Sequence, residues 1–249
     1  MDTAYIYDGT FGGLMTCIFE MYSRHEEPVS IDTEDYFQQR MGTSVYNVIT
    51  DTEKSERVIK SALNKIGQDG FFEVYRAFLS DVCGREMIIS GYLKLVFKIG
   101  SAAKAYLSND YVCNMYKLSQ KTGSEAHLLT GFLRFEEMED GVLYAEMSPK
   151  SDCIEIVGGH FKSRLSALPF VINDRVRKKA FVYDTKNFDI AEYESFNAPN
   201  QTEKETDFQN MWRDFYKTVS IKARKNDRCR MTHMPKRYWK HMCELKDEK

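Results

Sequence analysis

Two side chains suited to acid–base chemistry stand four residues apart in the segment "HFKSR". If this segment is helical, His160 and Arg164 share a face, because positions four apart lie one turn from each other. An imidazole beside a guanidinium suits the binding or protonation of a phosphate or a developing oxyanion. The alternative is structural: a histidine bonded to the backbone and an arginine that caps the helix or pairs with an acid. Spacing alone favours the structural alternative.

Arg134 and Asp174 complete the set of candidate catalytic residues. Arg134 falls inside an alternating segment, where an arginine must be exposed or paired, and Glu136 offers a partner on the same face. Pairing and phosphate contact are equally expected at Arg134. Asp174 lies at a predicted turn. Together with His160 and Arg164, these two residues could line one Arg/His pocket that performs acid–base chemistry.

Positive charge is concentrated in two segments of a chain whose formal net charge is −2. Residues 160–180 carry six basic and one acidic side chain, and residues 224–242 carry seven and one. If the two segments meet, they form a positive face that can bind phosphates on an otherwise acidic body. The alternative is that both are simply solvated. The residues expected to contact nucleic acid are Arg175, Arg177, Lys178, Lys179, Arg224, Arg228, Arg230, Lys236, Arg237, Tyr238 and Trp239, the last two by stacking on bases.

Motifs of the common enzyme classes are missing from the sequence. There is no HExxH, GxSxG or Walker loop, and no Cys/His cluster with metal-ligand spacing, so no metal or cofactor is expected. The six cysteines are widely spaced and are expected to be reduced thiols. Without an apolar run of membrane length or a signal-peptide pattern at its start, the chain is expected to be cytoplasmic and not to bind a membrane.

The periodicity of apolar residues predicts an α+β fold. A short strand, a turn and a helix are expected at the start, followed by a helical part up to residue 130. Residues 131–249 alternate as two β-hairpins around a helix at 151–165, which predicts an antiparallel sheet with helices packed on it. Residues 184–205 are expected to be a loop. The next helix carries an apolar stripe expected to pack on the body, namely Phe208, Met211, Trp212, Phe215 and Val219.

These elements predict two parts, residues 1–130 and residues 131–249, in one compact unit. Pro235 suits the first turn of a last short helix. That helix would carry Tyr238 and Trp239, whose aromatic rings could also belong to the core.

Several separated motifs resemble a bacterial family of proteins assigned to DNA metabolism or DNA repair, whose domain has no established function. The resemblance rests on "GFLRFEE", on "HFKSRL" followed by "PFVINDRVRKKAFVYD", and on "MWRDFYKTVSIKARKN" followed by "MPKRYW". A segment like "YDGTFGGLMTCIFEMY" begins the longer members, so the resemblance covers nearly the whole chain. The chain departs from the pattern at Phe170, where tryptophan is common.

Members of this family are typically encoded beside a radical-SAM protein, and a related domain is fused behind uracil-DNA glycosylase-like domains. The resemblance therefore implies a DNA-binding accessory protein with DNA and a radical-SAM protein as partners. One alternative is an enzyme that processes damaged nucleotides at the Arg/His pocket. A third possibility is a protein-interaction subunit that docks its partner through the acidic residues 1–60 and the segment 184–205.

Overall fold

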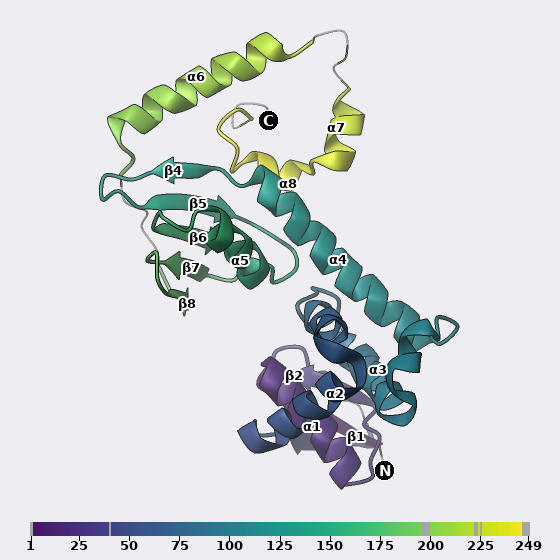
Figure 1. Cartoon of the computed structure of the whole chain (residues 1–249). Helices are drawn as coiled ribbons and strands as arrows, with labels where there is room; N and C mark the ends of the chain where they lie inside the picture. Colours follow the sequence, from purple (N-terminus) through teal and green to yellow (C-terminus); the bar gives the residue numbers. More distant parts are fainter. Residues whose placement is uncertain (1, 40, 196–199, 222–223, 225, 246–249) are drawn as a thin grey trace. The chain divides into compact units, whose positions relative to one another are not determined.

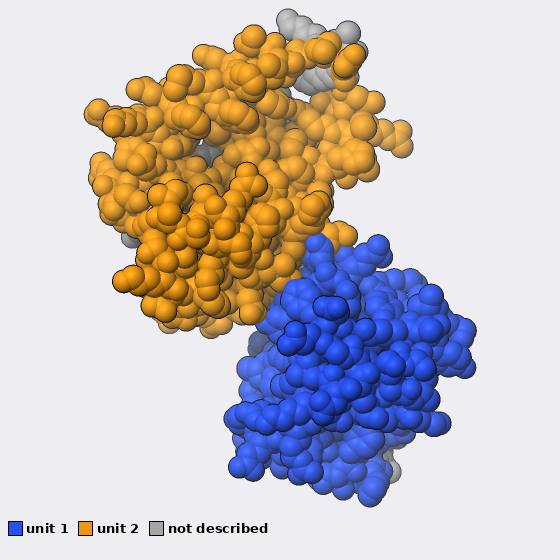
Figure 2. Space-filling model, viewed as in Figure 1, with its two compact units in different colours: residues 1–123 blue, residues 124–249 orange. Residues whose placement is uncertain are grey.

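The computed structural model describes residues 2–39, 41–195, 200–221, 224 and 226–245. The chain divides into two compact units, residues 1–123 and residues 124–249 (Figure 2). The division falls inside the long helix α4 (Asp110–Phe132) (Figure 1). Helices and two β-sheets are present, which confirms the α+β class. In the described residues no helix combines the length and the apolar character that a bilayer crossing needs.

A small parallel sheet begins unit 1, with strand order β2-β1-β3. The central strand β1 pairs in parallel with both neighbours, and its Tyr5 and the Ile31 of β2 are fully buried. Parallel strands need a crossover connection, and α1 supplies it between β1 and β2. The expected strand, turn and helix are therefore the start of a β-α-β unit. The bounds are β1 (Asp2–Tyr7), α1 (Phe11–Ser23), β2 (Ser30–Thr33) and β3 (Thr43–Asn47).

The glycine-rich turn between β1 and α1 is occupied by a carboxylate of the chain itself. Asp8 accepts hydrogen bonds from the backbone nitrogen and hydroxyl of Thr10, at 2.9 and 2.7 Å, and from the Thr50 hydroxyl at 2.7 Å. Burial opposes ionisation of Asp8, but these hydrogen bonds outweigh it and lower the pKa. Because the Asp8 charge already lies at the start of α1, a phosphate would be repelled there.

Helices complete unit 1. α2 (Thr52–Phe78) is capped by the side chain of Asp51 and kinks at Gly67, whose φ of +71° is one that other residues rarely adopt. It is followed by α3 (Arg85–Ile99) and the short 3-10 helix η1 (Gly100–Ala105). Phe11 of α1 packs edge-on against three aromatic rings of α2, which fastens these helices together.

Unit 2 is built on a five-stranded sheet with strand order β4-β5-β6-β7-β8. β4 pairs with β5, β6 with β7 and β7 with β8, all antiparallel. The pair β5 and β6 is parallel, so the sheet is mixed and the expectation of a wholly antiparallel sheet was wrong at this pair. The bounds are β4 (Phe135–Glu137), β5 (Leu143–Met147), β6 (Phe170–Asp174), β7 (Lys179–Tyr183) and β8 (Phe188–Glu192).

Helix α5 (Ile154–Arg164) explains the parallel pair. It carries the chain from the end of β5 back to the start of β6, so both strands run in the same direction. Its buried side chains Ile154, Val157 and Phe161 belong to the core of unit 2. Gly158 allows a close approach, because a Cβ atom there would lie 2.2 Å from the Phe181 ring.

The segment expected to be a loop, residues 184–205, contains the strand β8, while residues 196–199 lie outside the described part. Sequence reasoning missed β8 because it is short and exposed and lies in a segment that is polar as a whole. Three helices follow it: α6 (Glu203–Val219), α7 (Asp227–His233) and α8 (Lys236–Trp239) (Figure 1).

Candidate functional site

The basic segment 224–242 divides into exposed and internally paired cations. Arg224, Arg228 and Lys236 are exposed. Arg230 lies over the Trp239 ring at 4.3 Å and pairs with Asp227 at 3.2 Å. The exposed cations remain available for phosphates, and Arg230 holds α7 against α8.

Arg237 and Tyr238 both bind one buried carboxylate, that of Glu125 in α4. The Arg237 guanidinium lies 2.9 Å from it, and the Tyr238 hydroxyl donates at 3.0 Å. Burial opposes ionisation of Glu125, but backbone hydrogen bonds from Lys150 and Ser151 outweigh it and lower its pKa. Arg237 therefore neutralises an internal charge.

Tyr238 and Trp239, expected to stack on bases, are both buried. Tyr238 belongs to the core of unit 2, and Trp239 packs in a smaller cluster with Met242 and Leu245. The Trp239 indole donates to the Met234 carbonyl at 2.9 Å. A buried ring with its polar atom already bonded cannot stack on a base without unfolding of this segment.

The basic turn between β6 and β7 is likewise tied to nearby acids. Arg175 lies 3.2 Å from Glu146, and Lys179 lies 3.1 Å from Asp152. Arg177 pairs with the buried Asp174 at 3.2 Å. It also donates to the backbone carbonyls of Pro149 and Lys150. Lys178 is exposed, with a positive φ of 53°.

The four candidate catalytic residues lie on three different parts of unit 2. His160 and Arg164 share α5 and are exposed. Asp174 is fully buried at the end of β6, and burial raises its pKa despite the hydrogen bonds that it accepts from Val176 and Arg177. Their catalytic role stays a prediction.

Arg134 lies between α4 and β4. Its guanidinium donates to Glu244 at 2.7 Å and to the Gly131 carbonyl at 3.0 Å, whereas the expected partner was Glu136. The pocket that Arg134 lines does not include His160.

Helix α6 exposes the apolar stripe that its sequence was expected to bury, so that expectation was wrong. Phe208, Met211, Phe215 and Val219 are between 54% and 62% exposed, and Trp212 is 36% exposed. A different face of α6 makes the contacts, and its residues are polar or amphipathic. Gln209 is buried, Arg213 donates to the Cys243 carbonyl, and Tyr216 packs on the Trp239 cluster.

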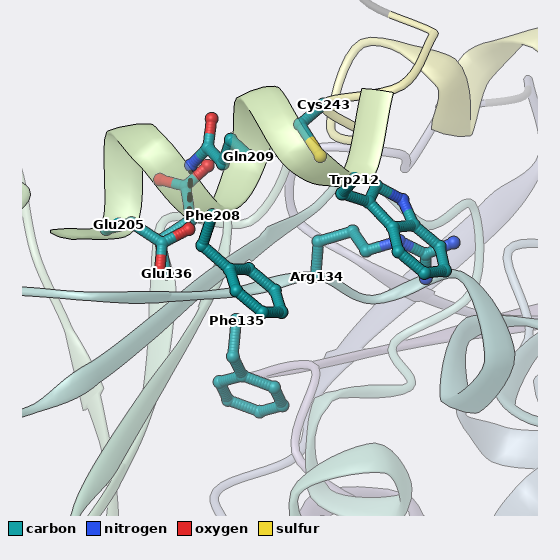
Figure 3. A pocket seen from close by; sticks show the side chains of 8 residues that line it. All are labelled: Arg134, Phe135, Glu136, Glu205, Phe208, Gln209, Trp212 and Cys243. Atoms are coloured by element: carbon teal, nitrogen blue, oxygen red, sulfur yellow. Dashed lines mark hydrogen bonds between the residues drawn. The ribbon is translucent and has the colours of Figure 1, made fainter. Parts of the chain in front are cut away.

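A pocket of about 330 Å³ lies between α6 and β4 (Figure 3). Because it is seen under α6 in this view, it is called the pocket below α6. The Phe208 and Trp212 rings extend from α6 toward β4, and carboxylates stand at the end nearest the start of α6. This is the lower range of volumes for small-molecule sites, roughly 300–1,000 Å³. The lining residues are Arg134, Phe135, Glu136, Glu205, Phe208, Gln209, Trp212 and Cys243.

A serine, a histidine and a carboxylate, here called the Ser148 line, follow one another in space: Ser148, His241 and Glu146. The Ser148 hydroxyl lies 2.9 Å from His241 Nε2, and the other ring nitrogen lies 3.6 Å from Glu146. His241, with the Tyr144 hydroxyl and Arg175, lowers the pKa of Glu146 to about 2, against the effect of burial. Sequence reasoning missed this cluster because 93 residues separate Ser148 from His241 and no local motif joins them.

This line has the order of groups found in nucleophilic hydrolases. Two features oppose such a role: Ser148 is only 8% exposed, and the next residue, Pro149, has no backbone N–H to offer an oxyanion. Among the described residues, no group of three or more His, Cys, Asp or Glu side chains is arranged to hold a metal ion.

Comparison with known families places the chain in one of them. Residues 83–244 match DUF4130, a domain of unknown function, and the chain belongs to this family. The match includes part of unit 1, all of the sheet of unit 2, the pocket below α6 and the Ser148 line. No curated protein matches the chain.

Proposed function

We propose that this chain is an accessory protein of DNA metabolism that binds nucleic acid through one face of unit 2. That face, here the C-terminal face, consists of the exposed side chains of α6 and the exposed cations of residues 224–240. The observation that carries the proposal is the presence of exposed aromatic rings and exposed cations on adjoining elements. Arg230 of α7 donates to the Tyr216 hydroxyl of α6 at 3.4 Å, so the two elements are in contact.

Two kinds of group together hold a single-stranded nucleic acid without reading its sequence. Cations neutralise phosphates and release counterions, and exposed aromatic rings stack on unpaired bases. The C-terminal face offers Arg224, Arg228, Lys236 and Lys240 for the first task. Phe208, Trp212 and Phe215 suit the second, because they are exposed on α6. Since stacking requires unpaired bases, single-stranded DNA is the expected ligand.

The proposed partner is a radical-SAM protein, as the family resemblance implies. The absence of Cys/His cluster motifs in the sequence is compatible with radical chemistry in a second protein. Met211 and Val219 on α6 are exposed and apolar, and they could contribute to a protein contact beside the nucleic acid.

The test is binding of labelled single-stranded and duplex oligonucleotides across a salt series, followed by fluorescence anisotropy. The variant replaces Arg224, Arg228, Lys236 and Lys240 with alanine. Because each phosphate contact contributes nearly one unit to the slope of log K against log salt, the slope should become shallower by up to about three units for single strands.

The control variant removes the same amount of charge from exposed positions of unit 1: Lys60, Lys65, Lys98 and Lys117 to alanine. It should retain the wild-type slope. An absence of binding at low salt, or equal slopes in the two variants, would contradict the proposal.

An enzyme that processes damaged nucleotides is the second candidate, and the Ser148 line favours it. Here His241, and not His160, has a hydroxyl to deprotonate and a carboxylate to orient it. Uracil-, abasic- and photoproduct-containing DNA should then be altered by the wild type and left intact by His241→Gln. A His160→Gln control should retain activity. Unaltered DNA in every reaction leaves only the binding function.

A further inference from the structure

The aromatic part of the pocket below α6 has the form of a slot. Phe208 and Trp212 are four residues apart and therefore share one side of the helix, and both lie over β4 in Figure 3. Below them lies Phe135 of β4, whose ring points away from α6 and packs edge-on against Phe161 at 4.9 Å and Phe170 at 5.7 Å between centroids. The β4 side of the slot is thus anchored in the core, while the rings from α6 are exposed.

The polar part of the pocket accepts hydrogen bonds. Glu136 and Glu205 stand together at the end of the slot (Figure 3). The one cation of the lining, Arg134, is already paired with Glu244 at 2.7 Å. Glu205 is held by neutral hydrogen-bond donors, and the only cation of the lining is already paired, so the pocket favours N–H donors over a phosphate.

Both carboxylates are held in place by neighbours. Glu205 accepts from the backbone nitrogen of Glu137 at 3.2 Å and from Gln209 at 2.9 Å. Glu136 accepts from the side chain of Gln201. A carboxylate has about four acceptor sites, so Glu205 can accept further hydrogen bonds.

A flat ligand with N–H donors on one edge fits both parts of the pocket. Resting on the proposed function, we propose that this pocket holds one unstacked nucleobase bearing an exocyclic amino group, that is, cytosine, adenine or guanine in preference to thymine. Its ring stacks on Trp212 and Phe208, and its amino group donates to Glu205. Thymine has no amino group, and its single N–H on that edge lies between two carbonyl oxygens, which a carboxylate repels. The phosphates stay outside, where Lys204 is exposed one turn before Phe208.

Tryptophan fluorescence tests the pocket without any phosphate. The chain has two tryptophans; Trp212 is 36% exposed and Trp239 is 6% exposed, so an added nucleoside reaches mainly the first. Titration with 2′-deoxycytidine, 2′-deoxyadenosine and thymidine, excited at the red edge, should quench emission. The apparent affinity for the two amino-bearing nucleosides should exceed that for thymidine by about tenfold, as expected for one charge-assisted hydrogen bond.

Matched variants separate the pocket from the rest of α6. Trp212→Leu should abolish the saturable quench, while Met211→Ala, at a neighbouring exposed position outside the lining, should retain it. Glu205→Gln should reduce the preference for deoxycytidine, and Glu203→Gln should not. Isothermal titration with the same ligands checks that the Trp212 variant has lost binding and not only its signal.

Equal affinity for all three nucleosides, or no saturable binding, would overturn the proposal. So would binding of Nα-acetyl-lysine amide in the absence of nucleoside binding, because the ligand would then be a protein side chain. The salt series with oligonucleotides reports separately on the proposed function. Nucleoside binding without oligonucleotide binding removes the function and keeps the pocket, and salt-dependent oligonucleotide binding without nucleoside binding does the reverse.

Discussion

Helices α5 and α6 have similar sequence patterns and opposite surroundings. Both carry large apolar residues three or four positions apart, yet α5 buries Ile154, Val157 and Phe161 in the core, and α6 exposes Phe208 and Phe215. The difference lies in the neighbours. Gly158 lets α5 approach the Phe181 ring, whereas α6 is attached through Gln209, Arg213 and Tyr216. Amphipathic spacing therefore identifies an apolar face without saying what covers it.

Truncation of one aromatic ring on each helix gives the largest expected contrast. Phe161→Ala should lower the free energy of unfolding by about 3–5 kcal/mol, because it leaves a cavity in the core. Phe215→Ala, at a 54% exposed ring, should change it by no more than about 0.5 kcal/mol. Urea denaturation followed by circular dichroism measures both. Equal losses would show that the stripe of α6 is covered in solution.

Arginines of the basic segment allow a second contrast, between paired and exposed side chains. Arg237→Ala should destabilise unit 2 by about 1–3 kcal/mol, since it removes a donor to the buried Glu125 carboxylate. Arg228→Ala should leave stability unchanged within about 0.5 kcal/mol and should weaken oligonucleotide binding. Thermal unfolding and anisotropy together distinguish the two effects. Identical behaviour of the two variants would contradict the assignment of Arg237 as an internally paired side chain and Arg228 as an exposed one.

Acid should weaken the attachment of the C-terminal segment to the sheet. The pKa of Glu146 falls from about 4.5 to about 2 in the folded state, so its contribution is present above pH 4.5 and is lost as the pH falls through 2. Since the side chain is 27% exposed, the contribution is about 1–2 kcal/mol after screening. Stability of Glu146→Gln should fall less than that of the wild type between these pH values. An equal fall in the stability of the wild type and of Glu146→Gln would exclude a contribution of Glu146 to the pH dependence. The control is Glu194→Gln, at an exposed position, which should behave as the wild type.

Loss of the α6 cap should have the smallest effect. The Thr202 hydroxyl accepts from the Glu205 backbone nitrogen at 3.1 Å, and Thr202→Ala should cost about 1 kcal/mol locally. Hydrogen exchange should speed up in α6 while exchange in α5 stays the same, because α6 has few buried contacts. Equal acceleration in both helices would mean that they open as one unit.

Local signals in the sequence predicted much of the fold. The helices, the α+β class and the buried stripe of α5 follow from apolar spacing. The parallel pair β5 and β6 could not be predicted with certainty, because pairing of strands across a helix depends on contacts distant in sequence. The exposed β8 has a short apolar alternation, Phe188 and Ile190, that does not stand out in a mostly polar segment.

The candidate site was less predictable than the fold. Charge identified the segment 224–242, but only distant partners such as Glu125 distinguish Arg237 from the exposed Arg228. Similarly, the sequence indicates that Arg134 needs a partner or exposure to solvent, but its partner Glu244 lies 110 residues away and no local pattern identifies it. The pocket below α6 joins residues from β4, α6 and the segment after α8, and no single stretch of sequence contains them.

The hydrogen bond between Glu125 and Tyr238 has a consequence for the timing of folding. The two residues are 113 positions apart, and Tyr238 fills part of the core. At a synthesis rate of about 5–20 residues per second, roughly 6–23 s pass between the incorporation of Glu125 and that of Tyr238. During that interval the Glu125 carboxylate of the growing chain lacks the hydrogen-bond donors Arg237 and Tyr238 that it has in the folded protein. The core of unit 2 therefore completes its packing only after Tyr238 has been synthesised.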